Sequence, residues 1–183
     1  ADCHFGSYHS TGTAALSIIR MSGDRSHEIA ISVFSSKGKE LKIKDIIHNR
    51  MYYGEFIDND GKTLDDVMIT FFRAPYSYTG EASVEIACHG SVFIQNKIME
   101  VLISNGARLA APGEYTMRAF INNKMDLTQA EAVADLISSQ NEAEHRIAIN
   151  QLKGGFSSEL QELRRELIDL TSLLELELDF GEE

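Results

Sequence analysis

Residues 83–104 read SVEIACHGSVFIQNKIMEVLIS, and this stretch decides the fold class of the first part of the chain. Val84 and Ile86 alternate with polar or small residues, which is the two-residue period of a strand with one buried face. After His89-Gly90 the apolar residues change to helical spacing, and Asn105-Gly106 supplies a helix stop. The apolar face consists of Phe93, Ile94, Ile98, Val101 and Leu102. A strand followed at once by an amphipathic helix predicts a sheet with helices packed on it.

The sequence before this stretch adds more strands and one helix. Residues 13–20 form a short apolar run that is typical of a buried strand, and residues 26–34 have helical spacing. Residues 51–57 and 67–72 are rich in β-branched and aromatic side chains, with the turn signal DNDGK at 58–62 between them. This pattern predicts a hairpin with a loop longer than two residues. The first ten residues have little periodicity, and we expect them to be irregular.

The sequence after it first adds a short helix, from Pro112 to about Ile121. The expected order is then roughly β-α-β-β-β-α-β-α, a mixed sheet with packed helices. From Thr128 onward the chain reads as helical, with Thr128 to Glu131 as a capping box and one interruption at Gly154-Gly155. Ser157 or Ser158 is expected to cap the helix that follows. We therefore predict an α+β domain at residues 1–122 and a helical domain at residues 123–183.

The last predicted helix carries a narrow seam of leucines. They follow three- and four-residue spacing at Leu160, Leu163, Leu167, Leu170 and Leu174. Such a stripe favours a helix that packs in a bundle over a free-standing coiled coil, because the repeat is short. Bundles usually need three or four helices. We therefore expect an incomplete helical bundle, whose leucines pack on a neighbouring chain or are partly exposed.

Composition and missing motifs exclude several classes of function. The 183 residues include 43% hydrophobic and 25% charged residues, as in soluble globular proteins, and carry a net charge of −11. That charge argues against this chain alone gripping a nucleic-acid backbone. Cys3 and Cys88 have no metal-ligand spacing, so no metal site is expected, and two cysteines suit a reducing, cytoplasmic location. No phosphate loop, dinucleotide fingerprint, zinc-protease motif or nucleophile elbow occurs, and no membrane span is expected.

Three charged residues are candidates for binding a ligand. Glu85 lies in mid-strand, where it either faces solvent or presents a carboxylate that can grip two adjacent N–H donors. Arg20 ends the first apolar strand, where it is either a solvated residue or a fork for a ligand carboxylate. Lys124 lies in a polar loop before a helix and is either solvated or a second cation for the ligand. An anionic clamp with one or two cations suits a ligand that has an amidine-like head and an acidic tail.

Nearly the whole chain, from about Thr11 to Glu183, resembles the MnmE (TrmE) family of tRNA-modifying GTPases. Several long segments in the same order carry this resemblance, which makes it more specific than a single short motif. The segments are YTGE at 78–81, Glu85, His89-Gly90, PGEY at 112–115, RAF at 118–120, NNKMDLTQAEA at 122–132 and LDF at 178–180. The sequence departs from the family at Ser91, where the family has a second glycine, and at STGTAA (10–15), where the family has a glycine-rich loop.

The resemblance implies a folate-binding domain with the fold of aminomethyltransferase tetrahydrofolate domains. It places the family's folate-contacting residues on Arg20, Glu85 and Lys124, and it implies a homodimer that holds 5-formyl-tetrahydrofolate or a related folate. In the family the GTPase domain is inserted in the helical domain, so we expect this chain to stop before that insertion, to have no catalytic residue and to lack GTPase activity. The full-length protein would use GTP, Mg²⁺ and K⁺, and would modify the wobble uridine of tRNA with the flavoprotein MnmG.

Two other functions remain open at this point. A stand-alone aminomethyltransferase-like folate enzyme needs an acid or base near the one-carbon unit, and the sequence does not identify one. A pure dimerisation scaffold needs no ligand, so dimerisation without folate uptake would distinguish it from the folate-binding module.

Overall fold

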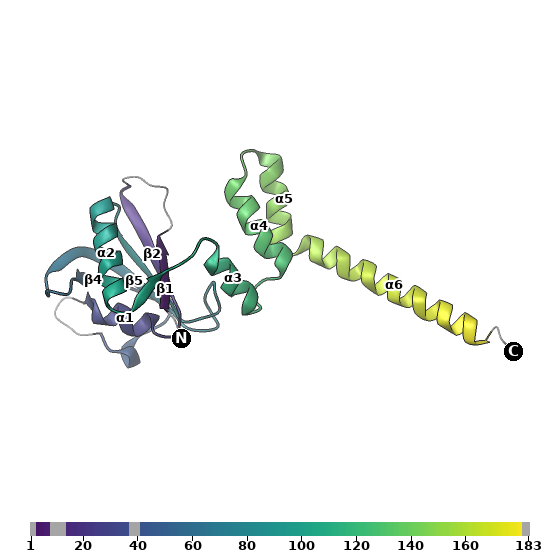
Figure 1. Cartoon of the computed structure of the whole chain (residues 1–183), viewed down its shortest axis with the longest axis horizontal. Helices are drawn as coiled ribbons and strands as arrows, with labels where there is room; N and C mark the ends of the chain where they lie inside the picture. The colour runs from purple at the N-terminus through teal and green to yellow at the C-terminus, as the bar shows by residue number, and fades with distance from the viewer. Residues whose placement is uncertain (1–2, 8–13, 37–40, 181–183) are drawn as a thin grey trace. The chain divides into compact units, whose positions relative to one another are not determined.

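The computed structural model describes residues 3–7, 14–36 and 41–180 of the chain. They form two compact units, Ala1–Lys124 and Met125–Glu183 (Figure 1). The first unit contains a sheet and helices, and the second unit is helical.

The described strands of the first unit form one seven-stranded sheet in the order β3-β4-β5-β6-β2-β1-β7. Neighbouring strands are antiparallel except β1 and β7, which are parallel. The strands are β1 (Cys3–Ser7), β2 (Leu16–Ser22), β3 (Phe34–Ser35), β4 (Met51–Ile57), β5 (Thr63–Phe72), β6 (Ser83–His89) and β7 (Ala107–Leu109). The predicted mixed sheet is confirmed.

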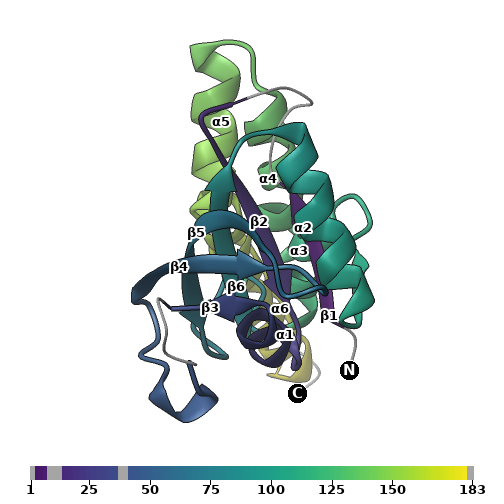
Figure 2. The same ribbon diagram turned by 90° about the vertical axis from the view of Figure 1, so that its left-hand side faces the viewer.

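Helices α1 (Ser26–Ser32) and α2 (Val92–Ser104) pack on one face of this sheet (Figures 1 and 2). Ile29 of α1 and Ile98 of α2 lie in the core. The strands contribute Ile19, Met21, Val67, Ile69, Phe71, Val84, Ile86 and Cys88. The alternate residues of β2 and β6 point to the other face, which is partly exposed. A 3₁₀ turn (Ile43–Asp45) and α3 (Glu114–Ile121) complete the unit.

Two predictions for the first unit were wrong. Cys3–Ser7 is a strand, although the first ten residues were expected to be irregular, because its backbone pairs with β2 and β7. The helix expected at 26–34 ends at Ser32, and Phe34 begins the short strand β3 instead. The predicted hairpin is confirmed, and its second strand begins at Thr63, four residues earlier than expected.

The second unit consists of α4 (Leu127–Ser138), α5 (Glu142–Leu152) and α6 (Gly155–Phe180). Asp126 caps α4 by accepting a hydrogen bond from the Gln129 N–H at 2.8 Å, and the Gln129 side chain accepts one from the Asp126 N–H at 2.9 Å. The capping box predicted at Thr128 was therefore wrong by two residues. A second interruption, at residues 139–141, was not predicted, and Asn141 caps α5 there.

Helix α6 begins at Gly155, directly after Gly154 takes a positive φ of 79°. The predicted caps Ser157 and Ser158 were wrong, because both lie inside the helix. Ser158 donates back to the Gly155 carbonyl at 2.8 Å, and Ser157 donates to Asp126 Oδ2 at 2.6 Å. The hydrogen bond from Ser157 is the main reason that the pKa of Asp126 is lowered. Asp126 thus joins the first residues of α4 and α6.

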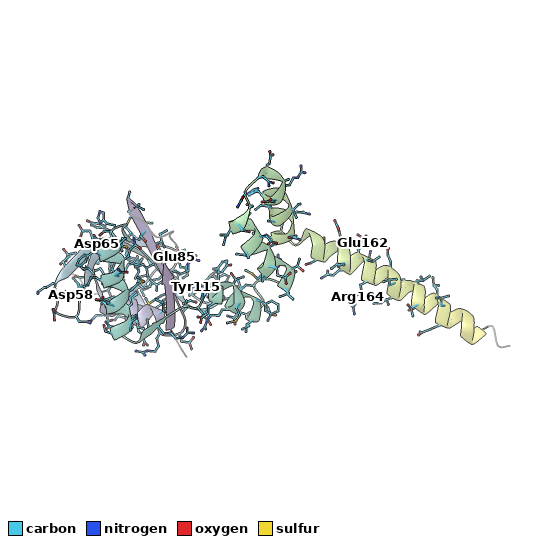
Figure 3. All side chains as sticks on the ribbon, turned by 45° about the horizontal axis from the view of Figure 1, so that its top comes forward. Asp58, Asp65, Glu85, Tyr115, Glu162 and Arg164 are labelled. Carbon is cyan, nitrogen blue, oxygen red and sulfur yellow. The ribbon has the colours of Figure 1, made fainter. Side chains whose placement is uncertain are left out.

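The leucine seam of α6 is half-exposed, as predicted. The exposed fractions of Leu160, Leu163, Leu167, Leu170 and Leu174 lie between 49% and 55%. Charged side chains such as Glu162 and Arg164 extend from the same helix (Figure 3). Among the residues that the structure describes, no helix is long and apolar enough to span a bilayer.

Gly54 in β4 lies beside the edge strand β3, where the sheet is sensitive to an added side chain. A Cβ at this position would lie 2.3 Å from the Ser35 carbonyl oxygen and 2.6 Å from Phe34 Cζ. We expect Gly54→Ala to lower the free energy of unfolding by about 3 kcal/mol, because the clash involves backbone. Urea unfolding followed by circular dichroism measures this.

Gly61→Ala is the matched control. Gly61 has a φ of 78° and open space around it, so alanine there should cost only about 1 kcal/mol of backbone strain. Equal losses in the two variants would contradict the steric argument.

Candidate functional site

Arg20 of β2 and Glu85 of β6 form the centre of the candidate site. They are direct partners across the two antiparallel strands, on the face opposite α1 and α2. Arg20 Nε donates to Glu85 Oε1 at 2.8 Å, and Arg20 Nη2 donates to the same oxygen. Both side chains are about one quarter exposed. Two residues that are 65 positions apart in the sequence thus form one largely buried ion pair.

A small hollow of about 50 Å³ adjoins this pair. It is lined by Arg20, Phe72, Ser77, Tyr78, Thr79, Ser83 and Glu85. The guanidinium carbon of Arg20 lies 5.7 Å from the ring centroid of Tyr78 and 5.9 Å from that of Tyr115. The Tyr115 hydroxyl also donates to the Arg20 carbonyl at 2.5 Å. Two aromatic rings therefore hold the guanidinium from the side of α3 and of the loop after β5.

That loop, residues 73–82, is fastened to the sheet by a buried group of hydroxyls. Ser22 Oγ lies 2.6 Å from Thr79 Oγ1, and Ser22 also donates to Glu81 Oε2 at 2.9 Å. Ser83 Oγ donates to Ser22 Oγ at 3.2 Å. The three hydroxyl residues are less than 5% exposed. Because buried hydroxyls need partners, this group specifies one position for the loop.

Helix α3 fastens the same loop from the other side through Arg118. This side chain donates to Glu81 Oε1 at 2.9 Å and to Glu114 Oε1 at 2.9 and 3.1 Å. Burial alone would lower the pKa of Arg118, and the hydrogen bonds to Glu114 and Glu81 raise it above its usual value. Glu114 is buried and also accepts from Arg108 at 2.9 Å and from the Ala111 N–H at 2.8 Å.

Lys124, the third predicted site residue, contacts this loop as well. Its Nζ donates to the Pro75 carbonyl at 3.0 Å, and Asn122 donates to the Thr79 carbonyl at 2.7 Å. Gly80 has a φ of 78°, and a Cβ there would lie 3.2 Å from Lys124 Cγ, so glycine allows this close approach. The structure therefore brings Arg20 and Glu85 into direct contact and joins Lys124 to the loop that lines their hollow.

Sequence reasoning assigned no role to several residues of this arrangement. Tyr78, Tyr115 and Arg118 lie in the segments quoted above, but their contacts with Arg20 and Glu81 depend on the tertiary fold. The one available signal was Glu114 and Arg118, which are four residues apart and therefore share a helix face.

Cys88 lies in the core on the other face, and burial raises the pKa of its thiol to about 11. A thiol so protonated is a poor nucleophile. Within the described ranges, no group of three or more His, Cys, Asp or Glu side chains could hold a metal ion.

Comparison with known proteins matches both units to one family. The profile described as "GTP-binding protein TrmE N-terminus" covers residues 7–124, and the "MnmE helical domain" profile covers residues 127–183. A protein from Flavobacterium johnsoniae named "tRNA modification GTPase MnmE" is 51% identical over 94% of this chain. Proteins of the same name from Parabacteroides distasonis and Bacteroides thetaiotaomicron are 50% and 51% identical over 93% and 92% of it. The chain spans 36–37% of the length of these relatives.

Glu114 provides a test of how the loop is held. We expect Glu114→Ala to lower the free energy of unfolding by about 3 kcal/mol, because Arg108 and Arg118 lose a buried partner. Glu100→Ala, which removes an exposed carboxylate of α2 paired with Lys97, should cost less than about 0.5 kcal/mol. Urea unfolding measures both variants, and similar small losses would show that the Glu114 network adds little.

Proposed function

The chain belongs to the MnmE (TrmE) family of tRNA modification GTPases, and from this premise we propose that its first unit binds a reduced folate. The observation that carries the proposal is the Arg20–Glu85 pair beside Tyr78 at the partly exposed face of the sheet. We propose 5-formyl-tetrahydrofolate or a related one-carbon folate as the ligand.

Glu85 is suited to the pterin head. Its contacts with Arg20 use Oε1, and within the described part of the chain no hydrogen bond reaches Oε2. A pterin has a guanidine-like edge with adjacent N–H donors, which a carboxylate accepts well. Tyr78 adds an aromatic ring beside the hollow, against which a flat ring system can pack.

The cations near the loop are suited to the acidic tail of a folate. Arg20 carries a planar guanidinium that matches a carboxylate, and Lys124, which donates to the Pro75 carbonyl of the loop, adds a point charge. The Glu85 carboxylate and the Tyr78 ring thus suit the pterin head of a folate, and the two cations suit its acidic tail.

The size of the hollow supports a site that two copies complete. Its volume of about 50 Å³ is well below the 300–1,000 Å³ that is typical of ligand pockets, so the described residues of one chain do not enclose a folate. The same face carries Leu16 and Ile18, which are 54% and 41% exposed, in line with Arg20 along β2. We propose that this face pairs with a second copy and that the folate lies at or near the interface.

The activity of the longer relatives extends the proposal to the whole protein. Their name describes a tRNA modification GTPase, and we propose that the protein to which this chain corresponds binds GTP with Mg²⁺ and K⁺ outside the described residues. We further propose that it acts on wobble uridine of tRNA in the cytoplasm, together with the flavoprotein MnmG. In this scheme the folate supplies the one-carbon unit.

Titration calorimetry with 5-formyl-tetrahydrofolate tests the folate site. We expect binding by the unchanged chain and about 10- to 100-fold weaker binding by Glu85→Gln, because a charge-assisted hydrogen bond to the pterin is lost. Arg20→Lys and Lys124→Ala should weaken binding less, since the first keeps both positive charges and loses only the planar fork, and the second leaves the Arg20 cation in place.

The matched control is Glu55→Gln, which removes a carboxylate from β4 of the same sheet. It should bind like the unchanged chain. No binding by the unchanged chain would sink the folate proposal, and equal binding by Glu85→Gln would refute the site assignment.

Self-association has its own test, by analytical ultracentrifugation. We expect Ile18→Glu to weaken the dimer at least about tenfold, because it places a charge in the centre of an apolar contact. Ile43→Glu changes an isoleucine outside the sheet that is 54% exposed, against 41% for Ile18, and should leave the dimer intact. A dimer that forms without folate uptake would favour the scaffold function, and an unchanged dimer in Ile18→Glu would exclude this face.

A further inference from the structure

Two histidines, His27 and His48, lie next to each other at the two ends of loop 73–82, which lines the candidate site. His27 belongs to α1, and His48 belongs to the segment after the 3₁₀ turn. Their ring centroids are 5.6 Å apart, and His27 also contacts the Phe71 ring edge-on at 5.4 Å. Neither residue belongs to the proposed folate site, so the pair requires its own explanation.

His27 closes the base of loop 73–82. Its Nε2 lies 3.1 Å from the Phe72 carbonyl and 3.3 Å from the Ser83 carbonyl. Carbonyl oxygens only accept hydrogen bonds, so Nε2 carries the proton and donates to both. Phe72 is the last residue of β5 and Ser83 is the first of β6, so one imidazole N–H holds together the two ends of the loop.

The start of α1 reinforces this closure. The Gly23 N–H and the Ser26 hydroxyl both donate to the Ala82 carbonyl, each at 2.9 Å. A change in the position of His27 would therefore also move the loop that carries Ser77, Tyr78 and Thr79.

His48 is poorly placed to accept a proton. Its Nδ1 is buried and has no hydrogen-bond partner among the described residues. Burial lowers the pKa of His48 most, followed by the charges of His27 and of Arg73, the first residue of the loop. Among the described residues, these two side chains, on α1 and on the loop, are the titratable and charged groups that act on His48. A proton on His48 would add a positive charge close to the Arg73 guanidinium and to the His27 ring.

We propose that His27 and His48 form a pH-sensitive clamp, in which His27 holds loop 73–82 in place and proton uptake by His48 loosens it. His48 repels Arg73 once it is charged, and because the His48 ring contacts the His27 ring, their separation moves the base of the loop. The proposal rests on the folate site proposed above where it concerns ligand affinity, because Tyr78 and Thr79 line that hollow. Its effect on the loop itself does not depend on any ligand.

The direction of the pH effect follows from the lowered pKa of His48. The unfolded chain takes up a proton near the usual value of 6.5, before the folded chain does. The stability that neutral His48 contributes is therefore complete above that pH, and it is lost as the pH falls through the lower folded pKa.

The experiment follows the backbone amide signals of Ser77 to Gly80 by NMR from pH 8 to pH 5. In the unchanged chain we expect these signals to shift with the midpoint of the His48 ring, and in His48→Gln we expect them to remain steady. His145→Gln, which removes an exposed histidine of the second unit, should behave like the unchanged chain. Loop signals that titrate identically in His48→Gln would overturn the proposal.

A second experiment, which measures folate affinity as a function of pH, distinguishes failure of this proposal from failure of the folate proposal. From pH 8 to pH 5.5, the Kd for 5-formyl-tetrahydrofolate should rise about fivefold more in the unchanged chain than in His48→Gln. His27→Phe, which lacks the N–H donor, should bind weakly at every pH, and His27→Gln should recover part of the affinity. If no folate binds, the folate proposal fails while the amide titration still decides the clamp, and parallel Kd profiles would overturn the coupling to the site.

Discussion

The pairing of β2 with β6 is the constraint on which the core and the candidate site both depend. It sets Ile19 opposite Ile86 in the core and, one residue further, Arg20 opposite Glu85 on the partly exposed face. Because side chains alternate between the faces of a sheet, a slip of one residue would bury Arg20 beneath the helices and expose Ile19. Because that exchange would cost much free energy, the register that keeps Arg20 opposite Glu85 is fixed by the core, and not by the partly exposed ion pair itself.

Around this pair the chain builds a rigid support for one loop. Buried hydroxyls of β2 and β6, the Arg118 network of α3 and His27 of α1 all bond to residues 73–82 or to the ends of this loop. Binding residues on loops need such support to keep their geometry. The loop itself has neither strand nor helix periodicity, and its conformation is nevertheless specified by contacts from β2 and β6, from α3 and from α1.

Periodicity alone was enough for the mixed sheet, the helix after β6 and the exposed leucines of α6. Glu85 was found because it is a charged residue in the middle of an alternating strand, and Arg20 because it ends a short apolar run. Their contact could not be predicted, since the register between two strands depends on the whole sheet. Cys3–Ser7 was missed because it is held by backbone pairing rather than by an apolar pattern. The cap at Asp126 was missed because Thr128 and Glu131 offer the same local chemistry two residues later.

The hydrogen bond between Ser157 and Asp126 anchors the first turn of α6, so the rest of the helix extends from a fixed base. Twenty-six helical residues extend about 39 Å at 1.5 Å per residue, and those from 158 to 176 are exposed. A rotation of about 10° at the base of such a helix would move its far end by about 7 Å. Small changes at Gly154, which precedes α6, and at Gly155, its first residue, are therefore amplified along the helix. A partner that contacts the leucine seam would be displaced mainly by a change in the angle of α6.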